Sequence, residues 1–276
     1  MFIRQGLNPF TRKEFDLFNW GALESMMHPS TAPGVALVPT HSPRISKIGG
    51  VPEFVDSWPE GPSGPLPFIC QLDLGELAAQ AGRAWPTELP GRGIASLFFD
   101  ESAPFSNDAS DRKHFALVLD LGTRRRPTGS AHVAHSYSPV MLEIAAAPPS
   151  SGPMHQVGGA PKWIQAPWAA PGHYLSGAYL RYPGVVAALE KVGVAEDVFL
   201  QGRDNIVAAG RRLDAAGIQP GHLAEGLRDW RLLFQIDADE TAGMLLGDMG
   251  RIHLFADPQT LQPGSAPLAW AELQDH

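Results

Sequence analysis

One eight-residue pattern occurs twice in this sequence, and it restricts the possible folds more than any other feature. Each copy reads β-branched residue, Gly-Gly, small residue, Pro, polar residue, aromatic residue, β-branched residue, and a tryptophan follows a few residues later. The copies are residues 48–55 with Trp58 and residues 157–164 with Trp168. Two further segments recur in the same order: 68–73 as 232–237, and 93–100 as 250–257. Three segments that recur in one order indicate an internal duplication.

The composition and charge distribution are typical of a soluble protein. With 29 Gly and 26 Pro, the chain favours short strands and loops over a helical bundle. The single cysteine, Cys70, excludes an intrachain disulfide framework and fits a reducing cytoplasm, and its apolar surroundings predict a buried, inert thiol. Charged residues interrupt the N-terminal segment where a signal peptide needs an apolar core, and no apolar run approaches the roughly 20 residues of a membrane span. We therefore expect a cytoplasmic protein without membrane contact.

Hydrophobic patterning divides the chain into three parts. Residues 1–46 contain a predicted helix (11–27) and a lead-in strand (35–38), residues 47–146 form the first repeat, and residues 147–276 form the second. Further strands are expected at 66–72, 94–99, 115–121, 140–145, 232–236 and 252–255, with a helix at 74–80. The second repeat has an extra segment of helical pattern at about 183–228. The predicted fold class is α+β: internally duplicated, mostly antiparallel β-sheets with a helical insertion in the second repeat, packed as one body.

Several of these residues resemble the YwqG-like family, a bacterial domain of unknown function. The resemblance rests on Gly49, Gly50 and Pro52; on Pro65, Leu66, Phe68 and Gln71; on Gln235 and Asp237; on Met244, Gly247, Asp248 and Gly250; and on Phe255 and Leu261. It covers most of the chain, from about residue 47 to 273. The longer N-terminal helix and the helical insertion depart from the family pattern. The resemblance implies an α+β fold with antiparallel sheets and internal duplication. It supplies no known reaction, but family members occur near polymorphic toxins, which makes immunity a plausible role.

The sequence lacks the common motifs of nucleotide, zinc and hydrolase sites, so we expect no cofactor and no catalytic residue. The closest approach to a metal loop runs from Asp237 through Asp239 to Asp248, which stands at the twelfth place of a calcium loop. Ala242 occupies the position where that loop needs glycine, and Asp248 is shorter than the glutamate it would replace. Capping and turn formation are therefore the favoured roles, and no metal is expected.

Five polar residues are candidates for lining a cleft between the repeats: Gln71, Asp73, Gln235, Asp237 and Asp248. Four of them occupy equivalent places in the two repeats. The functional interpretation is a polar pair facing a shared cleft, which would suit an enzyme or a small-molecule-binding protein. The alternative, which we favour, is that these side chains satisfy backbone groups where the strands end.

The formal net charge of −8 argues against nucleic-acid binding and is compatible with a basic protein partner. The candidate contact residues are acidic: Asp108, Asp111, Asp239 and Glu240. Together with the family's genomic setting, this leads to the hypothesis of an immunity protein that neutralises a cognate toxin, such as a nuclease, by stoichiometric occlusion. Acidic groups would then imitate the phosphates of a nuclease substrate. The enzyme or small-molecule interpretation stays open as the alternative.

Overall fold

The computed structural model describes residues 34–53, 57–102, 113–121, 137–147, 152–162, 164, 231–263 and 267–275. The predicted helix at 11–27 and the helical insertion at about 183–228 lie outside these ranges. About 42% of the described residues are in strands, and the only α-helix among them is the short α3 (Leu74–Ala81). The α+β class is therefore wrong: the described part is mostly β. Apolar runs of strand length, bounded by Gly and Pro, pair with one another, and α3 adds only Leu74 and Leu77 to their core.

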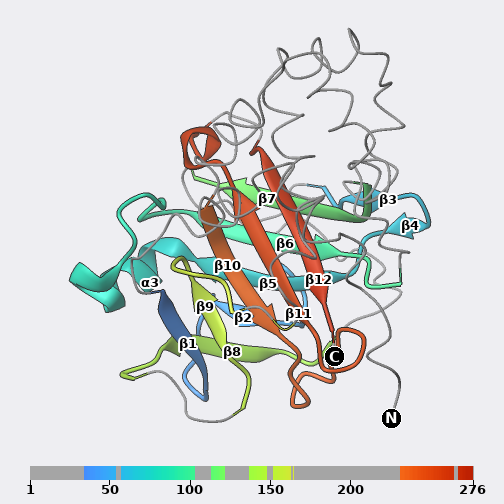
Figure 1. Ribbon diagram of the computed structural model, residues 1–276, viewed down its shortest axis with the longest axis horizontal. Coiled ribbons are helices and arrows are strands. Elements are labelled where there is room, and N and C mark those ends of the chain that lie inside the picture. Colours follow the sequence, from blue (N-terminus) through green and yellow to red (C-terminus); the bar gives the residue numbers. More distant parts are fainter. Residues whose placement is uncertain are drawn as a thin grey trace, which may run out of the picture.

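One ten-stranded sheet contains almost all of the strands (Figure 1). Its members are β1 (Val35–Thr40), β2 (Lys47–Ile48), β5 (Phe68–Asp73), β6 (Ile94–Phe99), β7 (Phe115–Asp120), β8 (Val140–Ile144), β9 (His155–Val157), β10 (Arg231–Asp237), β11 (Arg251–Ala256) and β12 (Ala269–Gln274). The strands β3 (Glu60–Gly61) and β4 (Gly64–Pro65) form a separate hairpin. Two short 3-10 turns complete the described elements: η1 (Gly82–Ala84) and η4 (Pro258–Thr260).

The spatial order of the large sheet is β12-β11-β10-β9-β1-β8-β2-β5-β6-β7, and every pair is antiparallel. The strand β1 precedes β2 in the sequence but pairs with β8 and β9, whereas β8 precedes β9 but pairs with β1 and β2. The two ends of the sheet approach each other, and the rings of Phe115 on β7 and Trp270 on β12 meet with centroids 6.3 Å apart. The sheet is thus nearly closed and barrel-like, and β10–β12 cross in front of β5–β7 in Figure 1.

The main hydrophobic core lies on one face of this curled sheet, because side chains alternate between the faces of a strand. Residues of both ends of the sheet share this core, including Leu72, Leu97, Phe234, Ile252 and Leu254. A smaller cluster of Leu66, Phe68 and Phe98, with Trp58 packed against it, lies apart from the main core. The continuous apolar core leaves the opposite face of β9–β12 for polar side chains.

Both Gly-Gly segments leave their strands in the same way. The backbone N–H of Gly49 donates to the carbonyl oxygen of Ile69 on β5 (2.8 Å), and that of Gly158 donates to the oxygen of Leu233 on β10 (3.1 Å). All four glycines have positive φ: Gly49 63°, Gly50 72°, Gly158 62° and Gly159 75°. Glycine adopts this conformation without the clash that a Cβ atom would cause. Each segment therefore turns out of the sheet and across one of its faces.

Candidate functional site

A row of polar side chains crosses the four strands β9–β12 on one face of the sheet. The pairing places Gln156 beside Gln235, Gln235 beside His253, and His253 beside Glu272. The neighbouring row on the same face contains Asp237, Arg251 and Gln274. The alternate residues of these strands point to the main core, so the polar rows lie on the face opposite it. Most of these polar side chains are nevertheless buried, and Gln235 and His253 have no exposed surface.

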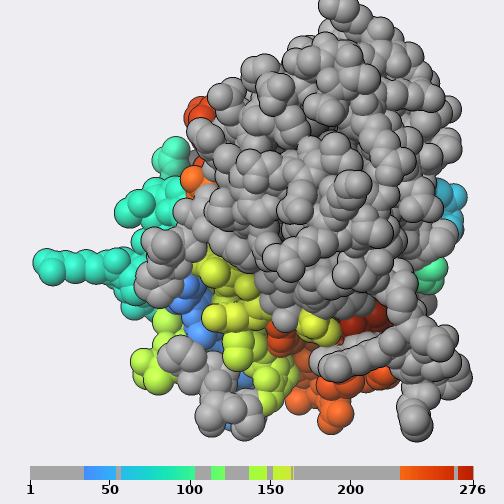
Figure 2. Space-filling view, in the orientation of Figure 1, coloured from blue at the N-terminus to red at the C-terminus, as the bar shows by residue number. Residues whose placement is uncertain are grey.

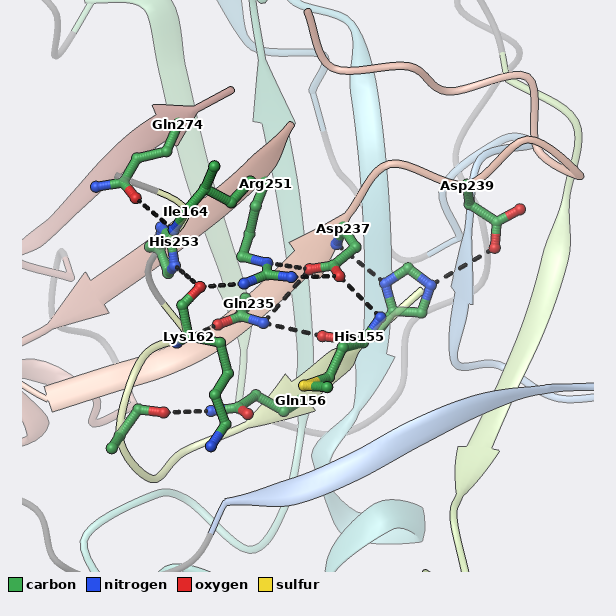
Figure 3. A network of polar contacts seen from close by, with 12 residues as sticks. His155, Gln156, Lys162, Ile164, Gln235, Asp237, Asp239, Arg251, His253 and Gln274 are labelled. Atoms are coloured by element: carbon green, nitrogen blue, oxygen red, sulfur yellow. Dashed lines mark hydrogen bonds and ion pairs between the residues drawn. The ribbon is translucent and has the colours of Figure 1, made fainter. Parts of the chain in front are cut away.

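The second Gly-Gly segment lies across this polar face and is held there by side chains of the sheet (Figure 3). Gln235 accepts a hydrogen bond from the N–H of Lys162 (2.8 Å) and donates to the carbonyl oxygen of Met154 (2.9 Å). Gln274 accepts from the N–H of Ile164 (3.1 Å). Gln156 donates to two carbonyl oxygens of the segment, at residues 158 and 160 (both 2.9 Å). The amide side chains therefore replace the strand partner that this stretch of backbone lacks.

Arg251 connects the two polar rows to the same segment. Its Nε and Nη2 donate to the two carboxylate oxygens of Asp237, at 2.5 and 2.8 Å, which is the bidentate geometry that suits a guanidinium group. Its Nη1 donates to the carbonyl oxygen of Lys162, which also accepts from Nε2 of His253 at 3.3 Å. Asp237 additionally accepts from the N–H of Met154 (2.8 Å). Both members of the Arg251–Asp237 ion pair thus also bond main-chain atoms: Arg251 bonds Lys162, and Asp237 bonds Met154.

Two members of the rows have displaced pKa values. Burial, together with the positive charge of Arg251, lowers the pKa of His253 to about 3, so its ring is neutral at physiological pH. Burial raises the pKa of Glu272 to about 7, although the hydrogen bond from Gln274 (2.8 Å) acts in the opposite direction. Glu272 therefore exchanges its proton near neutral pH, next to a neutral histidine.

A second histidine lies beneath the loop that follows β10. His155 and Asp239 are both buried, and their Nε2 and Oδ2 atoms are 3.6 Å apart, which is longer than a hydrogen bond. Nδ1 of His155 accepts from the N–H of Asp237 (3.2 Å), and Oδ1 of Asp239 accepts from the N–H of Ala242 (3.0 Å). The ring of His155 lowers the pKa of Asp239, and burial opposes this effect. The pair positions the loop against the core.

The first half of the chain has the same hydrogen-bond frame. Gln71 accepts from the N–H of Glu53 (2.7 Å) and donates to the carbonyl oxygen of Ile45 (3.2 Å), as Gln235 does with Lys162 and Met154. The N–H of Asp73 donates to Oγ of Ser46 (3.0 Å), where that of Asp237 donates to His155. In both halves the glutamine side chain bonds main-chain atoms. These are the contacts expected if the glutamines satisfy backbone groups rather than line a cleft.

The halves differ in their ionisable groups. The strand pairing shows which first-half residues occupy the equivalent positions. Ser96 stands in the place of His253, and Val118 in that of Glu272. Ile94 stands in the place of Arg251, and Ser46 in that of His155. At these four positions the ionisable groups lie in the second half alone, whereas the first half has Lys47, ion-paired with Glu53 (2.8 Å), at the position of Gln156. A sequence signal for the ionisable groups of the second half exists: Arg251 and His253, like Glu272 and Gln274, repeat the two-residue spacing of Gln235 and Asp237.

The structure does not bring the five predicted cleft residues together. Gln71 and Asp73 lie on β5, whereas Gln235 and Asp237 lie on β10. Four strands separate β5 from β10, which at about 4.8 Å per strand gives roughly 24 Å along the sheet. Asp73 caps α3 by accepting from the N–H of Glu76 (3.0 Å). Asp248 is exposed on the loop after β10 and belongs to neither group.

The predicted acidic contact residues also differ in their placement. Glu240 is exposed, but Asp239 is only 1% exposed and faces His155, so it cannot present its carboxylate to a partner. Asp108 and Asp111 lie outside the described residues. Within the described ranges, no three His, Cys, Asp or Glu residues are grouped so that they could hold a metal ion. The described part of the chain also has no helix with the length and apolar character of a membrane span.

Comparison with known families gives one match. A family model described as domain of unknown function (DUF1963) matches residues 120–265, which is more than half of the chain. The matched region contains His155, Gln235, Asp237, Arg251 and His253, and it ends before Glu272. A search of curated proteins found no match.

Proposed function

This chain belongs to the family described as domain of unknown function DUF1963, and we propose that it is a binding protein that neutralises a cognate bacterial toxin by stoichiometric occlusion. The observation that carries the proposal is that side chains of the polar rows bond backbone of the same chain. Gln235, Arg251 and His253 bond main-chain atoms of the second Gly-Gly segment. Side chains engaged in this way stabilise a shape, which is what a binding surface requires.

Charge and family setting support the choice of partner. The net charge of −8 favours rapid association with a basic protein, such as a nuclease. The resemblance to the YwqG-like family adds the occurrence of its members near polymorphic toxins. We place the encounter in the cytoplasm, where the single cysteine stays reduced and where an intracellular toxin would act.

Coexpression with the toxin-like product of a neighbouring reading frame tests the proposal. Expression of this protein is titrated against a fixed toxin level, and cell survival and complex formation by size-exclusion chromatography are followed together. Occlusion predicts that survival tracks the molar ratio and that a stable complex elutes. Protection at substoichiometric levels without a stable complex would contradict occlusion and favour an enzyme. Absence of protection would contradict immunity for that pair.

A further inference from the structure

The loop between β10 and β11, residues 238–250, exposes large apolar side chains to solvent. Leu245 is 53% exposed and Met249 is 43% exposed, and among the described residues Val51 is the only other large apolar residue in this class. In Figure 2 the orange surface at the lower edge of the molecule belongs to this region. These two exposed apolar residues lie within five positions of one loop and are not scattered singly over the surface.

The backbone of this loop has an unusual conformation. Leu246 and Met249 have φ angles of 51° and 54°, and they are the only non-glycine residues with positive φ in the described part of the chain. Leu246 is fully buried, so the core explains its conformation. Met249 is exposed and gains no such burial. Disfavoured backbone conformations cluster at binding and switch sites, and this one presents an apolar side chain to solvent.

Hydrogen bonds hold the loop in one conformation. Asp239 and Met244 exchange two backbone hydrogen bonds, of 2.7 and 3.0 Å. The N–H of Gly250 donates to the carbonyl oxygen of Leu246 (3.0 Å), and the N–H of Ser138 donates to that of Ala242 (2.8 Å). The loop is therefore ordered before any partner arrives, which reduces the entropy cost of binding.

The charges around the apolar pair select the partner's chemistry. Glu240 and Asp248 are exposed, and residues 238–250 contain no lysine or arginine. We propose that this loop is the contact surface for the toxin of the proposed function, and that it receives a basic protein segment carrying a large apolar side chain. Leu245 and Met249 are the central anchors, and the two acids form the charged rim.

A random library of 12-residue peptides, selected on the immobilised full-length protein, tests the surface without knowledge of the toxin. Selected peptides should combine Lys or Arg with large apolar residues. The double variant Leu245→Ser/Met249→Gly should weaken their binding at least tenfold, as expected for central anchors. Glycine accepts the positive φ of residue 249, so the fold should survive, and circular dichroism with a thermal melt checks this. The matched control Val51→Ser removes an equally exposed apolar residue outside the loop and should change binding less than twofold.

The rim has a separate readout. Glu240→Gln/Asp248→Asn should slow association and flatten its salt dependence. Failure to select any peptide, selection without basic bias, or equal binding to the anchor variant would each overturn the proposal. A change of oligomeric state in the anchor variant would assign the surface to a second copy of the chain and overturn it as well.

The inference rests on the proposed function, and coexpression separates the two. Protection that survives the anchor substitutions would overturn the loop as the toxin contact while leaving immunity intact. Lack of protection by the wild type, together with anchor-dependent binding of basic peptides, would overturn immunity for that pair and support the surface.

Discussion

Replacement of Glu272 by glutamine should make the protein more stable at neutral and alkaline pH, by an amount that grows between pH 4.5 and about 7 and is constant above that. Glu272 is 4% exposed, and Oε2 has no hydrogen-bond partner within the described structure. Its pKa is raised from the ordinary 4.5 to about 7 by burial. At about 1.4 kcal/mol per pH unit, this difference corresponds to about 3 kcal/mol.

The sign follows from which state binds the proton. Between pH 4.5 and about 7 the unfolded chain has released the Glu272 proton while the folded protein retains it, so the free energy of unfolding falls as pH rises. Above about pH 7 the folded protein carries the buried charge and the whole penalty is present. Its neighbour His253 acts in the opposite direction: its pKa falls from 6.5 to about 3, so its contribution to stability is lost as pH falls through that range.

Because His253 is present in both proteins, its contribution cancels in the difference between Glu272→Gln and the wild type. Urea denaturation from pH 4.5 to 8 should show this difference increasing by about 3 kcal/mol and then levelling off. Glu60→Gln is the matched control, because this exposed carboxylate stays in water whether or not the chain is folded. A difference for Glu272→Gln that stays constant over the whole range would refute the claim that the fold keeps this carboxyl group protonated.

Three further predictions concern the glutamine hydrogen bonds, the first Gly-Gly segment and the buried cysteine. Gln71→Ala and Gln235→Ala should each lower the free energy of unfolding by about 2–4 kcal/mol, because each leaves a partly buried N–H and a partly buried carbonyl group unpaired. A cost in urea denaturation below about 1 kcal/mol for either variant would contradict this role. Gly49→Ala should lower the free energy of unfolding by about 3 kcal/mol or more, since its Cβ would lie 2.3 Å from a backbone oxygen. Gly82→Ala, with open space around its Cβ, should lower it by about 1 kcal/mol. Equal losses in thermal melts would contradict the steric explanation. Cys70 is fully buried, and burial raises the pKa of its thiol. Alkylation by iodoacetamide should therefore follow global unfolding across a urea series. Modification of the folded protein at the rate of a free thiol would disprove this.

The strands could be predicted where the sequence has apolar runs of strand length. The expected strand 94–99 coincides with β6, and the expected helix 74–80 lies within α3. The two short strands β2 and β9 were missed, because two or three residues carry no readable period. The α+β class is wrong because the described residues form mostly sheet, and the helical patterns at 11–27 and about 183–228 that the prediction included lie outside them.

The candidate site was predictable only in part. The repeat predicts that Gln71 and Gln235 occupy equivalent positions, and in the structure both side chains accept a hydrogen bond from a backbone N–H. The burial of Asp239 could not be foreseen, because it depends on His155, which is distant in the sequence. The sequence could not show that Arg251, His253 and Glu272 are neighbours. Their proximity depends on the register between β10, β11 and β12, which the sequence of one strand does not specify.

The exchanged positions of β1 and β8 have a consequence for synthesis on the ribosome. Val35 on β1 pairs with Val157 on β9, about 120 residues later in the chain. Until β8 has been made, β1 has no partner and β2 lacks one of its two neighbours, and one edge of β1 then stays unpaired until β9 follows. The nascent chain must therefore expose unpaired strand edges until β9 has been made, a state that invites aggregation and engages chaperones. Because β1 pairs with β8 of the first repeat on one side and with β9 of the second on the other, a break in the chain between β8 and β9 would leave β1 with an open edge unless the two pieces reassociate.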